Sequence, residues 1–218
     1  FEALPLFQTL QDLHLENNRP MKSLNKIKNT RLMTAAVLFL FLAGHASATI
    51  GREVTMIDGT GFPNSIEVNK NRLHLKGAAM LRVLIFVEAY AGAFYLPREA
   101  DGSMALDDIG KYLELEYRVA ISAEDFADAT RQKIKESLPP ADFSRLLPKI
   151  ESLNRLYRSV QPGDRYALAY IPGEGTQLIY NSTPLGSVSG ADFANALFGI
   201  WIGENPIDKG FRDKLLGK

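Results

Sequence analysis

The sequence predicts an α+β fold in which helices pack against a large, mostly antiparallel sheet. Segments with strand patterns come first, two helical patterns follow, and a hairpin precedes a final pair of helices. This order differs from the regular alternation of strands and helices that builds parallel sheets. No internal repeat or low-complexity tract divides the chain, which favours a single domain.

The first 48 residues are expected to lie outside this domain. A basic stretch precedes an apolar run of about thirteen residues, and the tripeptide ending at Ala48 matches a signal-peptide cleavage site. The run is shorter than the roughly 20 residues that cross a bilayer. We therefore expect an upstream extension over 1–20, a signal peptide over 21–48, and a periplasmic or secreted domain over 49–218, without a stable membrane anchor after cleavage.

Composition narrows the classes of function open to the domain. From Thr49 onward there are 20 basic and 22 acidic residues, unlike the clustered positive charge of nucleic-acid binders. The chain has no cysteine, which excludes disulfides and thiolate metal sites. His74 is the one histidine after the leader, so a zinc site lacks a second histidine and a Ser-His-Asp triad would depend on His74 alone. We expect no nucleic-acid partner, no metal and no cofactor.

The first half of the domain has strand patterns. Residues 52–58 alternate weakly and end in an Asp-Gly turn signal, and another short strand is placed near 66–68. Longer strands are expected over 72–79 and 81–96, because apolar runs rich in β-branched and aromatic residues indicate one buried strand or a pair of them. Residues 113–119 alternate strictly, as in a strand with one solvent-exposed face.

Helical signals begin at Ser122, which forms a near capping box with Asp125. An amphipathic stripe follows Pro139-Pro140, and Gly203 suits the end of a later helix. The remaining elements are expected, in order, as two helices, a hairpin and two helices over residues 122–138, 143–160, 165–171 with 176–180, 189–203 and 207–216.

Arg82 stands at the start of the apolar run, where an unpaired guanidinium would be costly to bury. If the run is one regular strand, alternation places Arg82, Glu88 and Tyr90 on one aromatic face. The opposite face is small and aliphatic, suited to packing under helices. Arg82 then needs an anionic partner, either Glu88 or a ligand, and residue type alone favours a structural ion pair.

The run from Gly77 to Pro97 resembles the signature of the chalcone-isomerase-like family, especially its bacterial exported members. Gln161-Pro162-Gly163 with the hairpin near 173–175 resembles the family's Pro-Gly strand pair, and Ile202 to Pro206 resembles its C-terminal helix-turn-helix. The similarity covers nearly all of residues 50–217. It implies the family's open-faced β-sandwich, a large antiparallel sheet flanked by helices with a cleft between them.

The resemblance also implies candidate ligand-binding residues. The family includes enzymes that cyclise chalcones and relatives that bind fatty acids, and in both an arginine in the position of Arg82 meets an anionic group. Tyr90 and Asn195 occupy further cleft positions by the same comparison. The stretch 139–143, where the enzymes' catalytic tyrosine would fall, contains no tyrosine. We therefore assign no catalytic residue.

Three functions remain open at this point. The favoured one is a module that binds a small amphipathic anion, such as a fatty acid, with Arg82 as the anchor. The alternative is an isomerase of the intramolecular lyase type acting on chalcone-like phenolic enones. A second alternative is an envelope interaction protein with a vestigial cleft, which would expose apolar residues on the helix over 193–202.

Overall fold

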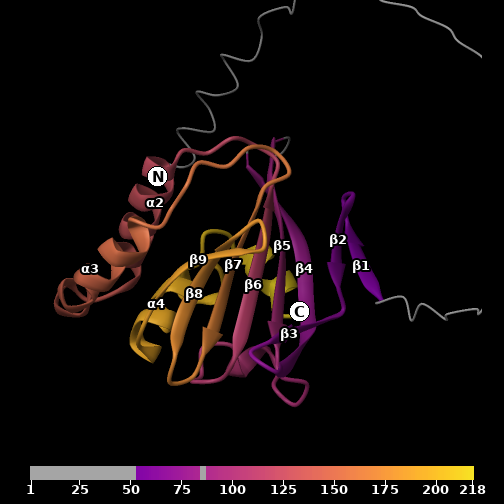
Figure 1. Ribbon diagram of the computed structural model, residues 1–218, viewed down its shortest axis with the longest axis horizontal. Helices are drawn as coiled ribbons and strands as arrows, with labels where there is room; N and C mark the ends of the chain where they lie inside the picture. The colour runs from indigo at the N-terminus through magenta and orange to yellow at the C-terminus, as the bar shows by residue number, and fades with distance from the viewer. Residues whose placement is uncertain (1–52, 84–86) are drawn as a thin grey trace, which may run out of the picture.

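Nine strands and four α-helices make up the part of the chain that the computed structural model describes, residues 53–83 and 87–218 (Figure 1). The strands are β1 (Val54–Ile57), β2 (Thr60–Pro63), β3 (Ser65–Val68), β4 (Asn71–Val83), β5 (Val87–Leu96), β6 (Lys111–Tyr117), β7 (Arg165–Ile171), β8 (Gly175–Tyr180) and β9 (Thr183–Val188). The helices are α2 (Ala123–Ser137), α3 (Pro140–Asn154), α4 (Ala191–Ile202) and α5 (Lys209–Leu215), with a 3₁₀ turn over Gly102–Met104.

The main sheet contains seven antiparallel strands, and their spatial order from β3 to β9 is also their order in the sequence. β1 and β2 pair only with each other among the described strands, and they lie beside β4. The predicted α+β class, with a large antiparallel sheet and helices packed against it, is confirmed. The leader segments predicted over 1–20 and 21–48, and the domain start at 49, lie outside the described residues.

The helices lie on one side of the sheet. Figure 1 shows α4 behind β8 and β9, with α2 and α3 beside the β9 edge. α2 contacts α3 and α4, and α5 contacts β4. Ser122 caps α2 in the predicted capping box, in which its hydroxyl accepts a hydrogen bond from the Asp125 amide. α3 ends at Asn154 rather than at the predicted residue 160, and Val160 instead pairs with Ile121 in an isolated bridge.

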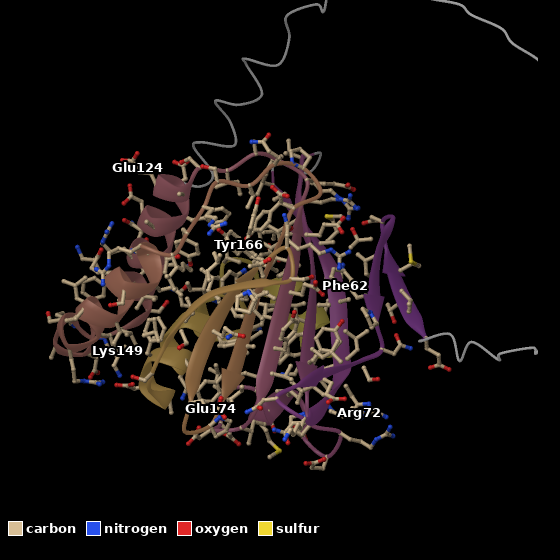
Figure 2. The ribbon with its side chains drawn as sticks, in the orientation of Figure 1. Phe62, Arg72, Glu124, Lys149, Tyr166 and Glu174 are labelled. Carbon is tan, nitrogen blue, oxygen red and sulfur yellow. The ribbon has the colours of Figure 1, made fainter. Side chains whose placement is uncertain are left out.

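Side chains pack on both faces of the sheet. The larger set, which we call the helix-side core, includes Phe94 of β5 and Phe198 of α4, with ring centroids 6.4 Å apart. The smaller set, the outer core, consists of Phe62, Leu73, Met80, Ala91, Ala93 and Tyr95. Phe62 comes from β2 (Figure 2), and the Arg165 guanidinium lies 5.4 Å from the centre of its ring. The β1–β2 hairpin therefore covers the outer face of the sheet.

Residues 81–96 contribute to a pair of strands rather than to one strand, because this segment holds the end of β4 and the whole of β5. Leu81 pairs with Tyr90, but the next residue, Arg82, pairs with Glu88. Ala89 is therefore an extra residue in β5, which makes a β-bulge. A bulge reverses the alternation of side chains, so Glu88 and Tyr90 lie on opposite faces.

The predicted roles of the two faces are reversed as well. Tyr90, Phe94 and Leu96 pack in the helix-side core, so the aromatic face is the one beneath the helices. Ala91 and Ala93 pack in the outer core. The physical reason is the size of the layers: the space between a sheet and helices needs large side chains, whereas the flat β1–β2 hairpin packs closely over alanines.

Two described strands, β2 and β9, were absent from the sequence prediction. β9 contains Pro184 and Gly186, both of which disfavour a strand. It forms one edge of the sheet, where a missing backbone donor is tolerated. Gly186 also leaves room for Leu156, whose Cδ1 would lie 2.9 Å from an added Cβ.

Gly77 lets the end of the chain approach β4. A Cβ built on this residue would lie 1.9 Å from the backbone oxygen of Lys214 in α5. Backbone atoms cannot move aside as the end of a flexible side chain can. Gly77 is therefore required for the contact between α5 and β4.

We expect Gly77→Ala to lower the free energy of unfolding by about 1–3 kcal/mol, because the methyl group forces α5 away from β4. Gly199→Ala in α4 is the control, since an added Cβ there meets nothing within 4 Å. That substitution should be neutral or stabilise the fold by up to about 1 kcal/mol. Urea titration followed by circular dichroism measures both, and equal losses would contradict the packing argument.

Lys111 is a fully buried cation at the first residue of β6. Its Nζ donates a hydrogen bond to the Asp107 carbonyl oxygen at 2.7 Å and lies 5.5 Å from the centre of the Tyr170 ring. Among the described residues it forms no ion pair with a carboxylate. Burial lowers the pKa of Lys111 to about 8, so its charged form is destabilised in the folded chain.

This pKa predicts a rise in stability with pH that Lys111→Met removes. Because the folded pKa lies below the ordinary value of 10.5, the unfolded chain binds more protons between these values, and stability increases as pH rises through that window. From about pH 7.5 to 9.5, below the titration of tyrosine, the gain is about 2 kcal/mol. Urea titrations across this range test it. Lys135→Met, at an exposed position of α2, is the control and should retain the rise.

Candidate functional site

A cavity of about 60 Å³ lies between the helix-covered face of the sheet, α2 and α4. We call it the helix-side cavity. Its aliphatic wall comes from β6, β7, β8 and α4. Its aromatic wall consists of Tyr90, Tyr117, Phe126, Tyr157, Tyr166 and Trp201. Most of the surface is apolar, as in sites for small apolar ligands.

The strict alternation of β6 turns Tyr117 toward this cavity. Leu113, Leu115 and Tyr117 are buried on the helix side. The Tyr117 ring meets its neighbours edge to face, 5.5 Å from Tyr90 and 5.3 Å from Phe126 between ring centroids. Aromatic rings favour such edge-to-face contacts, which fix the orientation of the Tyr117 ring in the cavity wall.

Most polar groups of the cavity already have hydrogen-bond partners. Trp201 Nε1 donates to the Tyr90 hydroxyl oxygen at 3.0 Å, and the hydroxyls of Thr130 and Tyr157 share a bond of 3.0 Å. The hydroxyl of Tyr166, labelled in Figure 2, donates to the Arg158 carbonyl oxygen at 2.9 Å. The Tyr117 hydroxyl, in contrast, forms no hydrogen bond with any residue of 53–83 or 87–218.

Burial keeps these hydroxyls protonated. It raises the pKa of Tyr90 and Tyr157 above the ordinary value of 10, and that of Tyr117 well above it. The pKa of Tyr166 rises to about 12 for the same reason. At neutral pH the cavity therefore offers hydrogen-bond donors and no phenolate.

Lys133 of α2 is the one charged residue in the cavity wall among the residues described. Its side chain is 9% exposed, and its Nζ lies 3.6 Å from Glu136 Oε2 at the end of the same helix. Its charge is thus partly balanced, while its methylene groups can line the apolar wall.

The structure places Arg82 away from the helix-side cavity. Its guanidinium forms ion pairs with Asp58 at 2.6 Å and Glu88 at 2.9 Å, and its side chain is 43% exposed. Asp58 belongs to the turn between β1 and β2, so the pair links that hairpin to the outer face. The β-bulge at Ala89 explains this placement, since it brings Glu88 opposite Arg82. This placement does not support an anchoring role for Arg82 in the cavity.

Asn195 lies at a different cavity from Tyr90. It lines a groove of about 460 Å³ with residues of α2, α3 and α4, among them Glu136 and Asp192. Its Oδ1 is buried and has no hydrogen-bond partner among the described residues. Of the three residues predicted to bind a ligand, Tyr90 alone lines the helix-side cavity.

Several residues of the cavity were missed by sequence reasoning. Tyr117 was within reach, because it shares the alternating face of Leu113 and Leu115. Trp201 and Lys133 were not, because their positions depend on how α4 and α2 pack on the sheet. No signal in a single sequence reports that packing.

The described residues contain neither a metal-binding cluster nor a membrane-spanning helix. No group of three or more His, Cys, Asp or Glu side chains could hold a metal ion there. No helix in that part of the chain is both long and apolar enough to cross a membrane.

Comparison with known proteins agrees with the geometry. A fatty-acid binding protein of Arabidopsis thaliana superposes with a TM-score of 0.62 at 18% sequence identity, over 76% of this chain and 96% of the plant protein. At this identity the likeness bears on the fold. No curated protein matches the sequence. The family model described as chalcone isomerase-like matches residues 54–217, and the chain therefore belongs to the chalcone isomerase-like family.

Proposed function

We propose that this domain binds a small amphipathic molecule, such as a fatty acid, in the helix-side cavity. The observation that carries the proposal is an apolar cavity whose wall includes a tyrosine hydroxyl without a partner among the described residues. Folded interiors are usually packed closely, and their buried polar groups are usually paired. A ligand would fill the space and satisfy the hydroxyl. The likeness in fold to a fatty-acid binding protein supports the same class of ligand.

The size of the cavity limits how a ligand enters. At about 60 Å³ it is smaller than the roughly 300 Å³ at the lower end of known ligand pockets. An acyl chain therefore requires the cavity to expand. We expect α2 to move outward, since it forms one wall of the cavity and reaches the sheet there through Phe126, which packs on Tyr117 of β6. Lys133, on α2, would then lie at the entrance.

Binding is proposed ahead of catalysis because of the chemistry of the cavity wall. Cyclisation of a phenolic enone needs stabilisation of a phenolate, and Arg82 was predicted to supply it. The Arg82 guanidinium is instead paired with two carboxylates on the outer face. The tyrosines of the cavity remain protonated at neutral pH. The isomerase alternative therefore lacks the residue on which it depended.

The third function predicted from the sequence, an envelope interaction protein, has no support from the exposure of α4. An interaction surface on α4 required Phe193, Leu197 and Phe198 to be exposed, and all three are fully buried in the helix-side core.

Export of the domain is also part of this proposal, and its support is the leader motif in the sequence alone. Fractionation of cells that express the full chain tests it, with the domain expected outside the cytoplasm.

Filling the cavity should prevent binding. We expect Ala129→Trp in α2 to weaken the binding of palmitic acid at about pH 5, where part of the acid is uncharged, by at least about tenfold, because the indole occupies the ligand's space. Ala141→Trp, at an exposed position of α3, is the control and should bind normally. Isothermal titration calorimetry on the full chain measures both. Equal affinities in the two variants would contradict binding in this cavity.

Replacing Arg82 distinguishes binding in the helix-side cavity from binding at Arg82 on the outer face. We expect Arg82→Met to leave palmitic acid affinity at about pH 5 within about twofold, and to lower stability only slightly, as for other exposed ion pairs. The same titration measures the affinity. If affinity falls by about tenfold or more while circular dichroism is unchanged, the ligand lies against the outer face and the arginine anchor predicted from the sequence is correct.

A further inference from the structure

The polar groups of the helix-side cavity define the kind of head group that it can receive. Tyr90 of β5 and Tyr117 of β6 are directly paired across the two strands. Their ring centroids are 5.5 Å apart. Since antiparallel neighbours on one face project in the same direction, the two rings lie side by side in the cavity wall.

Both hydroxyls have a proton to donate. The Tyr90 oxygen accepts its hydrogen bond from Trp201 Nε1, which leaves the Tyr90 proton without an acceptor among the described residues. The Tyr117 hydroxyl has no hydrogen-bond partner in that part of the chain. A hydroxyl that faces an apolar cavity without an acceptor is less stable than one that is hydrogen-bonded. A ligand oxygen that accepts from both tyrosines would remove this instability.

The charges that face this position do not favour an anion. Lys133 of α2 is already close to Glu136. Burial raises the pKa of Tyr90, and the negative charge of Asp208, which precedes α5, adds to that rise. Tyr166 of β7 and Tyr157, which follows α3, also line the cavity, and both are neutral. An ionised carboxylate would therefore lose its hydration without gaining a free cation.

We infer, on the basis of the binding function proposed above, that the helix-side cavity selects ligands whose head is an uncharged hydrogen-bond acceptor. Esters, ketones and protonated carboxylic acids belong to this class, and Tyr90 with Tyr117 receives their oxygen. Ionised fatty acids are excluded until they take up a proton. Tyr90 and Tyr117 are specificity-determining residues, and Lys133 belongs to the entrance rather than to the head-group site.

Three probes of equal chain length test this inference on the full chain: methyl decanoate, decanoic acid and decane. A carboxylic acid ionises at about pH 4.3 to 5, as a glutamate side chain does, so its neutral form becomes scarce at higher pH. We expect methyl decanoate to bind equally at about pH 5 and about pH 7.5, and decanoic acid to bind at least about tenfold more weakly at the higher value. Calorimetry, or displacement of a fluorescent probe, reports each affinity.

Variants assign the effect to residues. Tyr117→Phe should weaken methyl decanoate binding by about fivefold to tenfold, the value of one hydrogen bond, and leave decane binding unchanged. Tyr112→Phe is the matched control, because Tyr112 lies on the same strand and packs with the outer core. Equal affinities for the ester in the two variants would remove Tyr117 from the head-group site.

The outcomes separate this inference from the proposed function. If decanoate binds at about pH 7.5 as tightly as the ester, and Lys133→Met abolishes that binding, the cavity holds an anion and the inference is overturned while the binding function stands. If none of the three probes binds at either pH, the proposed function itself fails. Weaker binding of the acid at the higher pH, with the ester unchanged, supports both.

Discussion

The extra residue at Ala89 determines which side chains of the longest hairpin face the helices. Before the bulge, Glu88 lies on the outer face opposite Arg82. After it, Tyr90 lies on the helix side and reaches Trp201. The ion pair on the outer face and the hydroxyl on the inner face are thus two results of one irregularity in strand pairing. A regular strand could place one of them correctly, but not both.

This irregularity in strand pairing could not be predicted from the sequence, whereas other features of the fold could. The capping box at Ser122 and the alternation of β6 depend on local patterns, and each predicted its element correctly. The face on which Arg82 lies depends on a pairing between two strands, which no local pattern records. The pattern of the sixteen residues 81–96 is compatible both with one strand and with two strands of a hairpin, so the sequence alone does not distinguish them.

The position of Lys111 shows the same limit in another form. Its sequence neighbours indicate an exposed loop before a strand, and a lysine there is unremarkable. The structure buries it against Tyr170 and Phe198, which come from β7 and α4. Three elements distant in the sequence are needed to make this environment. Unusual sites of this kind, like the helix-side cavity itself, arise from the assembly of elements rather than from any one of them.

The contact between Gly77 and α5 has a consequence for the order in which the chain folds. Each strand of the main sheet pairs with its neighbour in sequence, so most of the sheet needs only short loops to close. Such local pairing is associated with rapid folding. α5 differs, because it joins the last residues of the chain to β4 near the beginning of the domain. We expect the sheet to form strand by strand. The contact between β4 and α5 forms only after the whole chain is present.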